Sequence, residues 1–385
     1  MKVRKRKNPR SFCCLLLMTA VLFLATSIPR SIYALDASSP VPAAAMKLVE
    51  FCDNPNNGLD QNAITTLVDY VLSAKQRKDV FLPKHYDSTG GYHEFDTRVG
   101  FARFLRYSYS SQIPFVLTSP SSLRYSLWKN VTGELPAVWK MMSPAAKPFV
   151  IHGLQRDVIT PDLTTGVYYE YDLRRTLIHF NYEGRQVLVA ISKQIDQSGV
   201  GKKGVILGDD DDWNYYYSGK PGSAKAGLGW VKSYIYDFFA VGVYVQTGTS
   251  GTVVRGGVFQ WIRAGWSGIN FAQPSHVING IKRFARNTKA IFESASLPEP
   301  GRIISAYRRF SSLPKEDLRD KYVQLHHARE SLALESGIIK KTEVKNQMSL
   351  VDTSRKQMID ELMLEYFKIA LGKSSLLEKK LVMAN

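Results

Sequence analysis

The spacing of hydrophobic positions divides this chain into a short helical segment, a β-rich middle and a helical C-terminal part. Between residues 60 and 72, apolar side chains recur at i, i+3, i+4, i+7 and i+8, the spacing of one helix face. Asp60 precedes this run and is expected to cap the helix. Pro83 and the Gly90–Gly91 pair follow, and they predict a loop.

Residues 165–272 predict an antiparallel sheet. The clearest hairpin has arms at 175–181 and 186–191, joined by residues 182–185. Its second arm is continuously apolar, so we expect it to be buried on both faces. Gly-rich joints separate further strand-like runs at 167–171, 204–207, 214–217, 230–239, 241–246 and 253–262.

Helical spacing returns after Pro274, with an apolar face and a basic face over residues 275–292. A linker is expected at 297–301, and two more helices around 312–336 and 352–372. The predicted fold class is therefore α+β: a central antiparallel β-rich domain, either a sandwich or an incomplete barrel, preceded by a short helical segment and followed by a C-terminal helical subdomain. The expected divisions are 1–34 (signal peptide or anchor), 35–58 (linker), 59–150 (mixed α/β), 151–273 (β-rich, aromatic), 274–296 (basic amphipathic helix) and 297–385 (helical hairpin region).

The first 34 residues have the pattern of an export signal. A basic segment ends at Arg10, an apolar run spans 12–28, and Ala34 is a suitable cleavage residue. The alternative is an uncleaved N-terminal anchor. We expect membrane attachment only if this anchor is retained. We expect an exported protein, periplasmic or extracellular.

Charge and composition narrow the class further. With 44% hydrophobic and 22% charged residues, the chain is not disordered throughout. Its net charge is +17, but residues 1–34 contain seven basic and no acidic side chains, so their removal lowers the charge to +10. The remaining charge is spread along the chain, and no nucleic-acid partner is expected. Cys52 is the only cysteine after residue 34, which excludes an internal disulfide.

Four consecutive aspartates at 209–212 form the most unusual local feature. Hard cations such as calcium prefer several oxygen ligands at short range. Tyr215 and Pro221 stand where an EF-hand needs glycine and glutamate, so the alternatives are an irregular calcium loop and a solvated acidic turn. No cofactor is required by any motif. The candidate metal ligands are Asp209, Asp210, Asp212 and Asn214.

Aromatic residues are enriched in the β-rich part, at 18 of the 105 residues from 166 to 270. Exposed rings beside acidic groups suit sugars, whereas buried rings are ordinary strand residues. On the first interpretation the ligand-binding candidates are Trp213, Tyr215, Tyr216 and Trp230. Arginines, among them Arg124, also alternate with aromatic residues over 98–125. We expect a solvated basic face there, and the alternative is contact with an anionic envelope polymer or with lipid headgroups.

Two weaker patterns suggest an exported hydrolase instead. Cys52 precedes two histidines in chain order, as in cysteine–histidine hydrolases, and two acids share one face of a strand, as in glycosidases. The catalytic candidates are Cys52, His152, His179, Glu170 and Asp172.

No motif here is specific enough to name a family. The leading hypothesis is an exported, non-catalytic binding protein for a glycan or an anionic envelope polymer. Its helical tail would pack on the β-rich part or mediate protein contact. The alternatives are an exported hydrolase and a tethered structural envelope protein.

Overall fold

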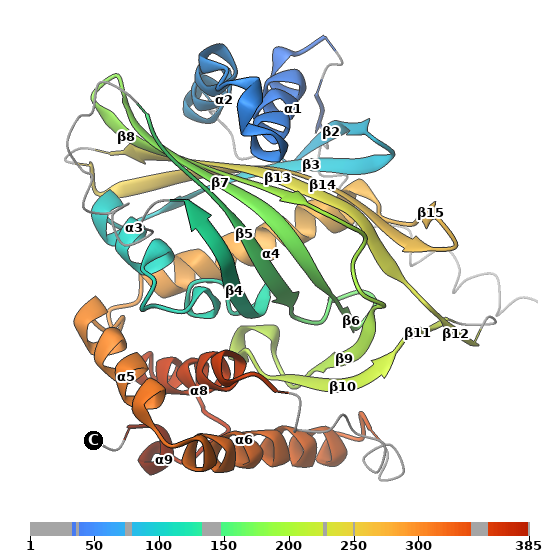
Figure 1. Cartoon of the computed structure of the whole chain (residues 1–385), viewed down its shortest axis with the longest axis vertical. Coiled ribbons are helices and arrows are strands. Elements are labelled where there is room, and N and C mark those ends of the chain that lie inside the picture. The colour runs from blue at the N-terminus through green and yellow to red at the C-terminus, as the bar shows by residue number, and fades with distance from the viewer. Residues whose placement is uncertain are drawn as a thin grey trace, which may run out of the picture.

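The fold is built on one large, strongly curved antiparallel sheet (Figure 1). The computed structural model describes residues 33–35, 38–73, 79–132, 148–225, 229–248, 251–339 and 353–383. Helices precede this sheet and follow it, which confirms the predicted α+β class with a helical C-terminal part. The described residues include no helix long and apolar enough to cross a membrane.

The strands of the main sheet come from regions far apart in the chain. Their order is β1-β2-β3-β14-β13-β8-β7-β5-β4, with β15 paired to β14. The expected domain division at 150/151 falls inside strand β5, which pairs with β4 and β7. The main sheet therefore continues across that division. The strands are β1 (Tyr33–Ala34), β2 (Val80–His85), β3 (Ser88–Thr97), β4 (Leu123–Thr132), β5 (Phe149–Ile159), β7 (Glu170–Tyr182), β8 (Arg185–Gln194), β13 (Tyr234–Thr247), β14 (Val253–Trp266) and β15 (Ile269–Asn270).

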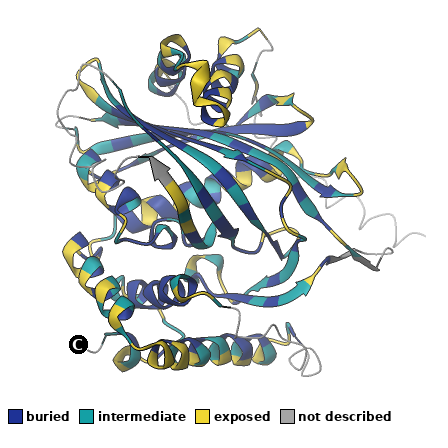
Figure 2. Ribbon diagram, viewed as in Figure 1, coloured by how far each residue is buried: buried dark blue, intermediate teal, exposed yellow. Residues whose placement is uncertain are grey.

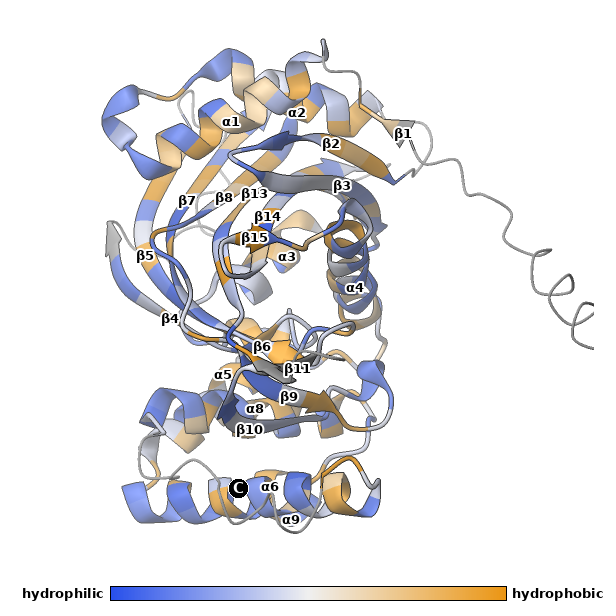
Figure 3. Ribbon diagram, turned by 90° about the vertical axis from the view of Figure 1, so that its right-hand side faces the viewer, coloured by the Kyte–Doolittle hydropathy of each residue, from blue (hydrophilic) through white to orange (hydrophobic). Residues whose placement is uncertain are grey.

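Both faces of the central strands are apolar, because successive side chains of a strand point to opposite sides. In β8, Val189 and Ile191 pack with α1 (Pro40–Asp53) and α2 (Gln61–Ser73) on the convex face. Leu188 and Ala190 belong to the core on the concave face, which also contains residues of α3 (Phe101–Tyr109) and α4 (Pro274–Phe292). Figure 3 shows the two helix layers on either side of the sheet.

A smaller assembly lies below the concave face. It contains a three-stranded sheet in the order β10-β9-β6, a β11–β12 ribbon and the C-terminal helices. Its elements are β6 (Val167–Tyr168), β9 (Lys202–Ile206), the 3-10 turn η4 (Asp210–Asp212), β10 (Tyr215–Pro221), β11 (Ser223–Lys225), β12 (Gly229–Val231), α5 (Pro300–Ser312), α6 (Lys315–Glu335), α8 (Arg355–Ala370) and α9 (Lys379–Met383). Two further 3-10 turns are η1 (Pro55–Asn57) and η2 (Phe115–Leu117).

The predicted hairpin and the first predicted helix cap are confirmed. In the β7–β8 hairpin Tyr182 pairs with Arg185, and the turn residues Glu183 and Gly184 have φ of 50° and 77°. The second arm is buried on both faces, as expected. The Asp60 carboxylate accepts a hydrogen bond from the Ala63 amide at 2.9 Å, which caps α2.

Three segments differ from the expectation. Residues 40–53, placed in a linker, form α1, because Pro40 suits the first helical turn and alanines follow it. The segment around Gly90, expected to be a loop, forms strands β2 and β3. Pairing of β3 with β14 and with β2 compensates for the low strand propensity of its glycines. Pro300, assigned to a linker, begins α5. Residues 1–34, predicted to be a signal sequence or anchor, lie outside the described residues apart from the last two, which form β1.

The helix α8 is buried on all sides for most of its length (Figure 2). It carries Glu361, whose carboxylate lies 2.9 Å from Arg124 Nε of β4 and also pairs with Arg329 of α6. Although burial opposes ionisation, these two arginines lower the pKa of Glu361 to about 2. Arg124 was expected on an exposed basic face, but this buried ion pair holds it between the sheet and the C-terminal helices.

Close packing at Gly90 gives the first prediction. Gly90 pairs with Trp261 of β14, and a Cβ atom there would meet the Trp261 indole and lie 2.8 Å from Leu82 Cβ. Gly90→Ala should therefore lower the free energy of unfolding by about 1–3 kcal/mol. Chemical denaturation measures this value. Gly100→Ala is the control, since nothing lies within 4 Å of the added atom. Equal effects of the two substitutions would contradict the prediction.

Asp360 makes stability depend on pH. Its carboxyl group is fully buried beside Lys356, and burial raises its pKa to about 6. The folded state therefore binds this proton more tightly than the unfolded chain. The resulting stabilisation is complete below about pH 4 and is lost as the pH rises through about 6.

Asp360→Asn should remove this dependence, because the amide stays neutral. Relative to the unsubstituted protein, its free energy of unfolding should rise from about pH 4 to about pH 7, by at most about 3 kcal/mol. Urea denaturation across this range provides the measurement. Asp320→Asn makes the same chemical change at an exposed position of α6 and should show no such trend. Parallel pH profiles for the two variants would refute the assignment.

Candidate ligand-binding cavity

A cavity of about 530 Å³ lies between the concave face of the sheet and α4, within the range of small-molecule sites. Strands β5, β7, β8, β13 and β14 form its roof, and α4 and the 115–123 segment close it. Most of its wall is apolar, including Val258, Ile281, Phe284 and Phe292. In a well-packed domain, a cavity of this volume has room for a small-molecule ligand and not only for a single water molecule.

Strand alternation places one cation in this apolar wall. In β7, Tyr171, Leu173 and Arg175 face the cavity. Arg175 pairs in register with Ser192 of β8, and its guanidinium donates a hydrogen bond to the Ser192 hydroxyl. Among the described residues no carboxylate lies within 4.0 Å of Arg175, and its Nε atom is buried without a partner. The cavity therefore contains a positive charge without a carboxylate in direct contact, although the Arg175 charge acts on Asp157 and lowers the pKa of that carboxyl group.

Three tyrosines surround this cation and also line the cavity: Tyr109, Tyr171 and Tyr244. Burial raises the pKa of each phenol, and the Arg175 charge opposes that shift. The phenols therefore remain protonated at neutral pH and can donate hydrogen bonds. Within the described chain their hydroxyl groups donate to no other residue.

Further polar atoms of the wall also have no partner. Ser121 Oγ, Gln155 Oε1 and Thr288 Oγ1 are buried without a hydrogen bond in the described structure. Buried polar groups in native proteins nearly always have partners, so these three atoms are exceptions within the cavity wall.

The acid nearest to this group is already occupied. Asp157 Oδ1 accepts hydrogen bonds from Ser126 Oγ and Gln155 Nε2, both at 2.6 Å. Burial raises the pKa of this carboxyl group, while the two hydrogen bonds oppose the shift. Asp157 thus makes its contacts with neutral donors and leaves the Arg175 side chain accessible from the cavity.

The predicted catalytic acids lie on the other face of the sheet. Asp172 is bound by Arg156 at 2.8 Å and by Lys129 at 2.8 Å, and Arg156 also lies 3.2 Å from Glu170. Arg156 and Lys129 lower the pKa of Asp172. Both acids therefore belong to a half-exposed ion-pair cluster rather than to an acid–base pair in the cavity.

The predicted cysteine–histidine pair is also divided by the sheet. Cys52 is buried in α1 on the convex face, whereas His179 faces the concave side and stacks on Phe101. His152 is on the Cys52 side, but its Nδ1 lies 2.9 Å from Thr176 Oγ1. Burial raises the pKa of Cys52 to about 11 and lowers that of His152, so both favour the neutral form. A reactive thiolate is thus disfavoured here.

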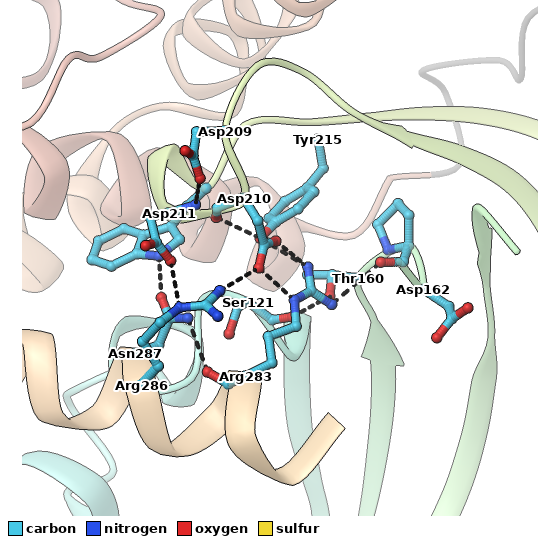
Figure 4. Close-up of polar contacts among 12 residues, drawn as sticks. Ser121, Thr160, Asp162, Asp209, Asp210, Asp211, Tyr215, Arg283, Arg286 and Asn287 are labelled. Atoms are coloured by element: carbon cyan, nitrogen blue, oxygen red, sulfur yellow. Dashed lines mark hydrogen bonds and ion pairs between the residues drawn. The ribbon is translucent and has the colours of Figure 1, made fainter. Parts of the chain in front are cut away.

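The four aspartates form the turn η4 against the basic face of α4 (Figure 4). Asp210 is held by Arg283 and by Arg286 at 3.2 Å, and Arg286 also lies 3.0 Å from Asp211. The Asp209 carboxylate accepts a hydrogen bond from the Asp211 amide at 2.9 Å. The arginine side chains thus occupy the position at which a calcium ion was considered.

The other proposed metal ligands point to different partners. Asn214 accepts a hydrogen bond from Lys368 of α8 at 2.6 Å, and the Asp212 charge acts on the same lysine. In the part of the chain that the structure describes, no three His, Cys, Asp or Glu side chains are grouped to hold a metal.

The expectation of exposed aromatic rings is wrong for three of the four residues. Trp213 is 1% exposed and donates its indole N–H to Asn287, while Tyr215 and Tyr216 are 2% exposed. The turn after η4 directs these rings into the C-terminal assembly, where they form core. Trp230 belongs to β12, and its side chain lies outside the described part.

Comparisons with known proteins add little to this geometry. No family model matches the chain, and no curated protein matches it in sequence. Among solved structures, the human StarD13 (DLC2) lipid transfer and protein localization domain is similar with a TM-score of 0.25 and 10% identity. The alignment covers 61% of this chain and 98% of that domain. A similarity at this level indicates neither a shared fold nor a function.

Sequence analysis placed Arg175 in the hairpin without giving it a role. Its signal was the single cation in the alternate positions Tyr171, Leu173, Arg175 and Leu177, an otherwise apolar face. A charge on such a face is costly unless it has a function or a partner.

The acidic turn gives a prediction with an internal control. Asp210 is 10% exposed and pairs with the equally buried Arg283, whereas Asp211 and its partner Arg286 are both 52% exposed. Asp210→Asn leaves the buried guanidinium without its counter-charge and should cost about 3 kcal/mol or more. Asp211→Asn should cost less than about 1 kcal/mol.

Thermal and chemical denaturation of both variants measure the difference. The same melts with calcium and with chelator should coincide for the unsubstituted protein. A calcium-dependent rise in melting temperature that Asp210→Asn abolishes would instead establish the calcium loop.

Proposed function

We propose that this protein is a non-catalytic binding protein whose cavity holds an apolar molecule bearing one anionic group, such as a carboxylate. The observation that carries the proposal is Arg175, a cation without a carboxylate partner in the apolar wall of a ligand-sized cavity. The proposal retains a binding role and replaces the glycan with an apolar anion. Export stays a prediction from the first 34 residues.

The electrostatics favour an anion over a neutral ligand. A guanidinium in an apolar cavity has lost part of its hydration, and a bound anion would compensate for that loss. Arginine recognises carboxylates through two parallel N–H donors, which fixes orientation as well as charge. Because Ser192 uses one donor, the remaining N–H groups and the nearby tyrosine hydroxyls are available for the anion.

The apolar wall favours a hydrocarbon body over a sugar. Sugars need many hydrogen-bond partners, and the rings expected to stack on them are core residues. Around Phe284 and Phe292 the cavity offers apolar contacts, each square ångström of which stabilises a buried hydrocarbon by about 25 cal/mol. The anionic group would then lie near Arg175 and the body against α4.

The test compares two ligands that differ only in charge. Dodecanoate should bind more tightly than dodecanol, because charge-assisted hydrogen bonds contribute about 1.5–3 kcal/mol. Arg175→Met should weaken dodecanoate binding about 10- to 100-fold and leave dodecanol binding nearly unchanged. Isothermal titration calorimetry or competition with a fluorescent fatty acid measures both.

Arg174→Met is the matched control. Arg174 is the next residue of β7, faces the convex side and lies 3.0 Å from Asp53 of α1. This substitution should leave both affinities unchanged. The proposal fails if the protein does not prefer the carboxylate to the alcohol, or if both variants lose the same affinity.

A further inference from the structure

The exposed large hydrophobic side chains of the described chain are unevenly placed. Two of the five, Tyr86 and Leu163, lie in tight turns and are 65% and 53% exposed. Two more, Ile269 and Phe271, lie in and directly after the short strand β15 and are 55% and 42% exposed. The fifth, Leu127, lies within strand β4. Isolated exposed apolar residues are ordinary, but a group of them around one feature calls for a partner.

Two of these segments border the cavity. The turn that contains Leu163 contributes Asp162, Thr164 and Thr165 to the cavity wall. The β14–β15 hairpin, whose strand β15 contains Ile269, contributes Trp266, and Phe271 directly after it also lines the cavity. We call Leu163, Trp266, Ile269 and Phe271 the rim. In Figure 3 the β15 hairpin and β6 face the viewer on the same side of the molecule.

The structure holds these segments in place. Trp266 and Phe271 stack with ring centres 3.8 Å apart, and the Gly268 amide donates to the Tyr236 hydroxyl at 2.8 Å. Asn270 Nδ2 donates to the Asp87 carbonyl at 2.8 Å, which joins the rim to the turn of Tyr86. These contacts hold the backbone of the β14–β15 hairpin in place, so that its apolar side chains stay exposed.

The charge near the rim favours an anionic surface. Lys84 and Lys232 are exposed, and Arg263 reaches the Gly268 carbonyl at 2.9 Å. Two acids, Asp87 and Asp162, lie in the turns of Tyr86 and Leu163, and Asp162 accepts hydrogen bonds within its own turn. Aromatic and aliphatic tips beside basic residues are the combination that binds the interface of an anionic bilayer.

We infer that the rim docks on an anionic lipid bilayer, so that the cavity exchanges its ligand directly with the membrane. The exchange, but not the docking, rests on the proposed function. An apolar anion is poorly soluble as a monomer and concentrates in bilayers. A cavity mouth pressed against the headgroups would receive such a molecule without passing it through water.

Tryptophan quenching by brominated lipid tests the docking on the full chain. Residues 1–34 contain no tryptophan, so insertion of that segment does not place an indole in the bilayer. Vesicles of brominated phosphatidylglycerol should quench the protein relative to unbrominated vesicles, and Trp266→Phe should remove most of that quenching. Brominated phosphatidylcholine should quench less.

A double variant, Leu163→Ser with Ile269→Ser, should lose the quenching and slow the transfer of a fluorescent fatty acid from vesicles. Leu127→Ser, an equivalent change on β4, should retain both. The double variant should still bind dodecanoate from solution with unchanged affinity, which shows that its cavity is intact.

Three results would overturn the docking: no quenching of the unsubstituted protein, quenching unchanged by Trp266→Phe and by the double variant, or equal quenching by both lipids. A concentration-dependent dimer that the double variant abolishes, without quenching, would assign the rim to a second copy. Loss of dodecanoate binding with intact quenching would remove the proposed function and leave the docking.

Discussion

The structure depends on a sheet whose central strands are apolar on both faces. In β8 the side chains of Val187 to Ile191 alternate between two separate cores, and neither face can be left in water. Two helices therefore cover the convex face, and the concave face needs α3, α4 and the 115–123 segment. Removal of either cover would expose a continuous apolar surface.

Curvature makes the two covers unequal. The convex face packs closely against α1 and α2, whereas a straight helix such as α4 cannot follow the whole concave surface. The remaining volume is the cavity of about 530 Å³, and Arg175 lies in its wall. The site that we propose for an apolar anion thus uses the same geometry that forms the core. It differs from that core in one inward-facing position, where Arg175 replaces an apolar residue.

Buried ion pairs account for the charge-rich motifs elsewhere. Asp210 with Arg283 holds the acidic turn on α4, and Glu361 with Arg124 and Arg329 joins the C-terminal helices to the sheet. Such pairs contribute little net stability compared with apolar packing, but each is costly to break singly. They join the smaller assembly to the main sheet and to α4.

Local patterns determined much of the secondary structure. The β7–β8 hairpin, the Asp60 cap and the α4 helix follow from alternation, turn residues and helical spacing, which act between residues close in the chain. Strands β2 and β3 were missed because Gly90 and Gly91 have low strand propensity, and long-range pairing with β14 decides their conformation.

The same holds for the site: the sequence contains one arginine on an apolar strand face, but only tertiary packing decided that this face borders a cavity and not a filled core. Tertiary packing also placed the aspartates of 209–212 beside arginines of α4 and buried Trp213. The environment of these side chains is set by residues dozens of positions away in the chain, which local sequence patterns do not reveal.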